Sequence, residues 1–216
     1  VSMSMFSAMI LMPIYVQTIK GISPIDSGLL MLPGALLMGV MSPITGKLFD
    51  KYGAKVLAIT GMSIVVISTY FFSDLSMETT YLQIMGIYTI RMFGISMVMM
   101  PVMTNGLNTL PMKAYPHGTA MNNTLQQVSG AIGSALLITI MNTRTTSAAK
   151  DLALSGADPA SILKTSMLEG INYTFFISTF IAAIALLLTL FIKKPTKVVT
   201  EEEKDQVYKQ QPVTES

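Results

Sequence analysis

Arg91 has the strictest chemical requirement in this chain, because it stands in the middle of a long apolar stretch. A cation inside a bilayer is costly unless it is paired or hydrated. One alternative is that Arg91 lines a water-filled cavity, where it could orient a substrate or couple to a proton-bearing carboxylate. The other is an interhelical hydrogen-bond hub involving Asn105, Asn122 or backbone carbonyls. No acidic residue lies within an expected span, so a carboxylate partner would have to come from outside these spans.

Two pairs of amide side chains occur in the most polar of the apolar stretches. Asn122 and Gln126 are four residues apart, as are Asn123 and Gln127, so each pair shares one face of a helix. Buried amides need partners, and they find them across helix interfaces or in polar cavities. We expect one pair to line a cavity and the other to pack, and either pair could fill either role.

A charged turn punctuated by glycine joins two apolar stretches of membrane length. Its residues are Gly46, Asp50, Lys51, Gly53 and Lys55. The glycines allow backbone conformations and close approaches that a side chain would block. The carboxylate could pair with a lysine or cap the following helix, whose N-terminus favours an anion. An acidic turn with flanking cytoplasmic lysines is the simpler interpretation of the same residues.

Proline and glycine also occur inside the apolar stretches. Proline removes a helical hydrogen bond and kinks the helix, whereas glycine lets helices approach closely. Kinked helices suit a bundle that must bend or rock, although packing alone explains any single glycine. The residues concerned are Pro33, Gly34, Gly39, Pro43, Pro101, Gly130 and Gly133.

The composition is that of a membrane protein. The chain is 51% hydrophobic and 12% charged, whereas soluble domains carry about 25% charge. A net charge of +2 gives no indication of a nucleic-acid partner. One His and no Cys predict neither a Cys-based zinc site nor disulfides, and we expect no cofactor and no enzymatic activity. The 19 Met residues are either ordinary apolar packing or a pliable cavity wall for varied hydrophobic ligands.

Apolar runs of about 20 residues, which is the length needed to cross the hydrocarbon core, occur six times. They are continuous and lack the alternation of strands, so helices are favoured. We predict an all-α membrane protein with six transmembrane helices in residues 1–194, at about 1–19, 27–46, 55–73, 81–107, 118–142 and 171–192.

The distribution of basic residues predicts the orientation. Nine lysines gather on one side of these spans and four basic residues on the other. The richer side is expected to be cytoplasmic. Both termini of the segment and the Gly46–Lys55 turn then face the cytoplasm of a multi-pass protein in the cell membrane.

The connections differ in character. Residues 143–170 are expected to form the longest external connection, with a short surface helix over 159–168 that begins at Asp158-Pro159. Asp26 is expected to cap the second span. Residues 195–216 are polar without an apolar face, which predicts a disordered cytoplasmic tail.

Several segments together resemble a known family. The turn matches the pattern Gly-x-Leu-x-Asp-Arg/Lys-x-Gly-x-Lys/Arg of the major facilitator superfamily. With the segment from Gly118 to Gly133, it is similar to the fourteen-helix drug:proton antiporters of the EmrB/QacA type and to lincomycin-resistance-type permeases. Further similar segments are residues 23–34, 99–101 and 108–111.

The resemblance implies that the chain is the C-terminal half of a longer multidrug exporter, built from two inverted three-helix repeats. It implies a lipid bilayer, a missing N-terminal half and small hydrophobic or cationic drugs as partners, with a proton gradient as the energy source. The turn would take part in the switch between outward- and inward-open states. Two alternatives stay open: a permease half for a sugar, lipid or peptide, and a six-helix membrane protein that does not transport.

Overall fold

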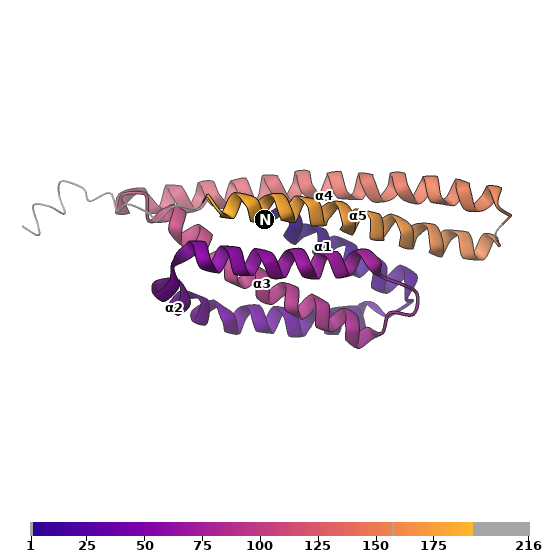
Figure 1. The fold of residues 1–216 in the computed structure, drawn as a ribbon, viewed down its shortest axis with the longest axis horizontal. Helices are drawn as coiled ribbons and strands as arrows, with labels where there is room; N and C mark the ends of the chain where they lie inside the picture. The colour runs from indigo at the N-terminus through magenta and orange to yellow at the C-terminus, as the bar shows by residue number, and fades with distance from the viewer. Residues whose placement is uncertain (1, 157, 192–216) are drawn as a thin grey trace, which may run out of the picture.

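The computed structural model describes residues 2–156 and 158–191, and every regular element in this part of the chain is helical (Figure 1). This confirms the all-α class. Four helical segments are long and apolar enough to cross a membrane, and Ala8–Ile19 forms a shorter apolar helix. The elements are α1 (Ser2–Ile14), η1 (Tyr15–Ile19, π-helical), α2 (Pro24–Phe71), η2 (Phe72–Asp74), α3 (Tyr81–Leu107), η3 (Met112–Ala114), α4 (Tyr115–Leu154) and α5 (Pro159–Thr189).

Helix α2 consists of two helical arms that meet at a sharp break at Gly53. It has 48 residues, which as a straight helix would be about 72 Å long, more than twice the hydrocarbon core of about 30 Å. Gly53 has φ 78° and ψ 166°, a conformation essentially restricted to glycine. The second arm, residues 54–71, therefore runs back in the opposite direction to the first arm, residues 24–52 (Figure 1). The expected turn over 46–55 is thus mostly helical, and the break is confined to Gly53.

Helices α4 and α5 are longer than the sequence suggested. Residues 143–154 continue α4, and α5 begins at Pro159 and runs without a break through the expected surface helix. The prediction of a long connection over 143–170 is therefore wrong, because helical residues fill nearly all of it. Both helices project beyond the ends of α2 and α3 (Figure 1). The predicted tail over 195–216 lies outside the described residues.

Capping fixes where α2 begins. Ser23 precedes Pro24 at the first helical position, and its Oγ accepts a hydrogen bond from the backbone N–H of Asp26 at 3.1 Å. The Ser23 hydroxyl also donates to Asp26 Oδ2 at 2.8 Å. The N-cap is therefore Ser23, and Asp26 supports it from the first turn, where a carboxylate complements the positive end of the helix dipole.

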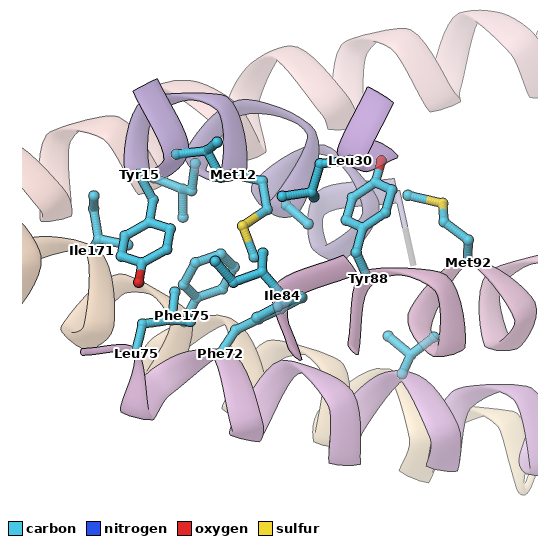
Figure 2. Close-up of a cluster of buried hydrophobic side chains, with 14 of the residues drawn as sticks. Met12, Tyr15, Leu30, Phe72, Leu75, Ile84, Tyr88, Met92, Ile171 and Phe175 are labelled. Carbon is cyan, nitrogen blue, oxygen red and sulfur yellow. The ribbon is translucent and has the colours of Figure 1, made fainter. Parts of the chain in front are cut away.

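One apolar core joins α1, η1, α2, η2, α3, α4 and α5. Its large buried side chains include Tyr15 of η1, Phe72 of η2 and Phe175 of α5 (Figure 2). The rings of Phe72 and Phe175 are tilted against each other, with centroids 5.2 Å apart. Aromatic pairs at this spacing are favourable beyond the area they bury. The core therefore ties the connection after α2 to the middle of α5.

The second arm of α2 and helix α3 pack with their backbones in near contact. A Cβ added at Gly61 would lie 2.6 Å from the carbonyl oxygen of Gly94, and one added at Gly94 would lie 2.8 Å from the carbonyl oxygen of Gly61. Small residues permit this approach between membrane helices, where packing rather than the hydrophobic effect drives association. The sequence analysis did not single out either glycine.

The predicted kink residues play different parts. Pro33, Pro43 and Pro101 lie inside helices. Gly34 packs against Tyr88 and Met92 of α3, whereas a Cβ at Gly39 would meet nothing within 4 Å. Gly130 and Gly133 of α4 receive Phe6 and Met3 of α1. Gly34, Gly130 and Gly133 therefore lie against neighbouring helices, whereas Gly39 faces no neighbour within the described residues.

A pair of Gly→Ala substitutions tests the contact between α2 and α3. Gly61→Ala places a methyl group against a backbone carbonyl, so we expect overpacking to lower the free energy of unfolding by roughly 1–3 kcal/mol. Gly86→Ala, in the same helix pair, meets nothing within 4 Å and should be neutral or stabilise by up to about 1 kcal/mol. Thermal unfolding in detergent measures both, and equal melting temperatures would contradict the proposed close contact.

Candidate functional site

A cavity of about 400 Å³ lies where α1, α3 and α4 meet. Its α3 wall is formed largely by methionines, and its α4 wall carries two amides and a hydroxyl. Flexible thioether side chains can adapt to ligands of different shape, and the few polar groups can orient them. The lining residues are Ser2, Val98, Met99, Met100, Val102, Met103, Asn122, Leu125, Gln126 and Ser129.

The structure distinguishes the two amide pairs. Asn122 and Gln126 both line the cavity, and Gln126 Nε2 lies 3.6 Å from the sulfur of Met99. Asn123 and Gln127 are exposed on the surface of α4. The cavity pair is therefore Asn122 and Gln126, and the second pair does not pack against a helix of the described chain.

Asn105 lies near the end of α3, partly buried, and is not among the residues that line the cavity.

Gly46 lies close to a residue of the cavity wall, which the sequence did not indicate. A Cβ at Gly46 would lie 3.6 Å from the terminal methyl of Met100, a cavity residue, and the hydroxyl of Ser42 lies 3.9 Å from the Met100 sulfur. The first arm of α2 thus reaches the cavity wall through Met100.

The charges around Gly53 face solvent or the membrane surface. Asp50, Lys51 and Lys55 are all exposed. Lys51 Nζ lies over the ring of its neighbour Tyr52, 5.3 Å from the centroid. Within residues 2–156 and 158–191, no ion pair joins Asp50 to either lysine. The Asp50 carboxylate is therefore exposed, three residues before the reversal of the chain at Gly53.

Arg91 is fully buried between α3 and the second arm of α2. Its Nη1 donates to the hydroxyl of Thr69, and that hydroxyl donates to the carbonyl of Val65 at 2.6 Å. Arg91 is not among the cavity-lining residues. This geometry includes an interhelical hydrogen bond to Thr69, a residue that the sequence analysis did not name. Arg91 and Gly94 are three residues apart, so the close backbone contact lies one turn away on the same helix face.

The sequence analysis missed Thr69, and it offered a methionine cavity wall as an alternative without saying which methionines would form it. Thr69 gave no signal, because hydroxyls inside transmembrane helices usually bond to their own backbone, as Ser68 also does here. Met99, Met100 and Met103 could have been grouped by their spacing of three and four residues along one helix.

The sequence profile of the Major Facilitator Superfamily matches residues 1–134. That range contains the Gly53 reversal, Arg91 and the cavity amides, and it covers more than half of the chain. The chain belongs to the Major Facilitator Superfamily. It is accordingly a multi-pass membrane protein of a transporter family.

Similar proteins carry transporter and drug-resistance names. The chain is 49% identical over 161 residues to the uncharacterized MFS-type transporter YhcA of Bacillus subtilis, covering 74% of this chain and 30% of that protein. It is 45% identical over 192 residues to the lincomycin resistance protein LmrB of Listeria innocua, covering 89% of this chain and 40% of that protein. LmrB of Bacillus subtilis is 42% identical over the same length, with the same coverage.

These findings confirm the resemblance to lincomycin-resistance-type permeases of the superfamily. They also show that the chain spans 30–40% of the length of these relatives. No group of three or more His, Asp or Glu side chains suited to a metal occurs in the described part of the chain.

Two substitutions at Thr69 test the bond to Arg91. Thr69→Val keeps the side-chain shape but removes the acceptor, so we expect a loss of about 1.5–3 kcal/mol in the free energy of unfolding, as for hydrogen bonds to charged groups. Thr69→Ser retains the hydroxyl and should retain most of the stability. Thermal unfolding in detergent measures the difference, and equal losses in the two variants would show that the bond contributes nothing.

Proposed function

We propose that this chain forms the C-terminal bundle of a drug exporter of the Major Facilitator Superfamily that works by alternating access. The observation that carries the proposal is the cavity of about 400 Å³ with a methionine wall on α3 and the Asn122–Gln126 pair on α4. Such a wall suits bulky apolar ligands of varied shape, and the amides supply neutral hydrogen-bonding groups. The drug-resistance names of the relatives support the same assignment.

The bundle is proposed to cross the membrane six times. The Gly53 break divides α2 into two arms, which with α1, α3, α4 and α5 give six helical segments of alternating direction. In this arrangement they form two inverted repeats of three segments each, as is common in the superfamily. The basic residues near Gly53 favour a cytoplasmic location for that end of the bundle in the cell membrane, with both termini of the segment on the same side.

The remaining part of the transporter is proposed to pack against α4 and the first arm of α2. Each carries an exposed apolar stripe at helical spacing. Leu125 of the α4 stripe also lines the cavity, so this face of α4 suits protein or a water-filled cavity. The stripes are Ile25, Leu29, Leu32, Leu36, Val40 and Ile44 on α2, and Met121, Leu125, Val128, Ile132 and Leu136 on α4.

Small hydrophobic or cationic drugs are the proposed substrates, exchanged for protons. The lining residues carry no charge, so the cavity of this half selects by shape and by neutral hydrogen bonds. The carboxylates that take up protons would then belong to the other half of the transporter.

An outward-facing apolar row on α5, containing Phe176, Phe180 and Ile184, is proposed to face the lipid.

A matched pair of substitutions in the transporter containing this chain tests the cavity assignment. Gln126→Leu removes a cavity amide, and we expect a change of about two- to tenfold in KM for drugs that accept or donate a hydrogen bond, as follows from the loss of one such bond. Gln127→Leu makes the same chemical change on the exposed side and should leave KM unaltered. Drug efflux from loaded cells measures both, and equal effects would argue against the cavity as the drug site.

Asp50→Asn tests the proposed switching role of the Gly53 end. Asp50 is exposed and forms no ion pair within the described residues, so neutralising it should cost the isolated bundle little stability. We expect drug resistance to be abolished with membrane expression unchanged. Asp74→Asn, an exposed carboxylate at the opposite end of the second arm, is the control and should transport normally. Full resistance in Asp50→Asn would refute the role.

A further inference from the structure

Residues 75–77, which connect η2 to α3 at the end of the bundle opposite Gly53, present three consecutive carbonyl groups. Each accepts a hydrogen bond from a side chain elsewhere in the sequence, and we call this set of three bonds the carbonyl anchor. All three bonds measure 2.7 Å. They run from Asn172 Nδ2 to Leu75 O, from the Tyr15 hydroxyl to Ser76 O, and from Lys20 Nζ to Met77 O.

The π-helical turn η1 accounts for the alignment of two of the donors. Tyr15 and Lys20 are five residues apart, and in an α-helix they would point about 140° away from each other. In η1 the backbone N–H of Lys20 instead donates to the carbonyl of Tyr15 at 3.3 Å. A π-turn joins residues five apart, so the two side chains reach adjacent carbonyls. Pro13, two residues before η1, cannot donate the usual backbone bond.

The acceptor segment is held in shape by its own hydrogen bonds. Thr79 Oγ1 accepts from the N–H of Ser76 at 2.9 Å, and the N–H of Thr79 donates to Ser76 O at 3.2 Å. The N–H of Thr80 donates to Gln83 Oε1 at 2.9 Å, which fixes the start of α3. The carbonyls of residues 75–77 are therefore presented by a preformed turn.

The anchor sits on the buried core. Tyr15, Phe72 and Phe175 are fully buried, Leu75 is 3% exposed, and Figure 2 shows the Tyr15 hydroxyl directed toward Leu75. Hydrogen bonds shielded from water lose more when a partner is removed, because the remaining group stays desolvated. The bonds of Tyr15 and Asn172 are thus better protected than the exposed bond of Lys20.

We propose that the carbonyl anchor is a positioning device that fixes the Tyr15–Lys20 end of the first helical segment to α5 through residues 75–77. The opposite end of that segment forms part of the cavity: Ser2 lines it, and Phe6 and Met3 pack on Gly130 and Gly133 of α4. The anchor therefore holds in place the helix that completes the cavity wall. The consequence for drug binding rests on the proposed function, whereas the anchor itself does not.

Hydrogen–deuterium exchange on the intact transporter in nanodiscs tests the anchor. Tyr15→Phe and Lys20→Met each remove one donor, and we expect exchange in residues 74–80 and 15–22 to accelerate by about five- to tenfold for Tyr15→Phe and by less for Lys20→Met. Lys20→Arg keeps a donor and should restore slow exchange. Met77→Leu is the matched control, because only the backbone of residue 77 takes part, and it should match the unmodified protein.

Two outcomes would overturn the proposal. One is unchanged exchange in both Tyr15→Phe and Lys20→Met. The other is equal acceleration around Gly61 and Gly94, which would indicate general destabilisation rather than local release. Drug efflux by the unmodified transporter, measured in parallel, separates the two proposals. If the variants show faster local exchange but the unmodified transporter exports no drug, the proposed function is contradicted and the anchor is still supported.

Discussion

The rest of the structure depends on the close approach of the second arm of α2 to α3 at Gly61 and Gly94. In hydrocarbon there is no water to solvate a cation, so Arg91 must be covered and hydrogen-bonded by protein. The two glycines bring the backbones together, and this lets the Arg91 side chain reach the hydroxyl of Thr69 while excluding lipid and water from both. A larger residue at either glycine would separate the helices and uncover the charge.

Because α3 is held against α2 on one side, its other residues are free to form the cavity wall. Tyr88, Arg91 and Gly94 pack toward α2, whereas Met99 and Met103, near the opposite end of the helix, line the cavity. Pro101 lies between these two methionines inside the helix and removes a backbone donor there. Arg91 and the wall of the proposed drug site thus occupy different parts of one helix.

Local chemistry made part of this predictable from sequence. The length of the apolar runs indicated membrane helices, Asp26 indicated a helix N-terminus close to the start of α2, and the spacing of Asn122 and Gln126 put them on one face. The exact break at Gly53 and the extent of α4 to Leu154 and of α5 from Pro159 were not predictable, because turn-like composition occurs within helical residues on either side of each break. The hydrogen bond between Arg91 and Thr69 was not predictable either, because it depends on which helices pack together, and residue spacing within one helix does not show that.

The two ends of the α2–α3 unit differ in how they are held. At Gly53, charged side chains are exposed and the reversal depends on one glycine conformation. At residues 75–77, three side chains from η1, its C-terminal flank and α5 bind consecutive carbonyls above a buried aromatic cluster. Rearrangement is easier where few contacts must break, so we propose that the bundle changes shape at the Gly53 end while the other end keeps its helices in register. This asymmetry places the exposed Asp50 at the less tightly held end.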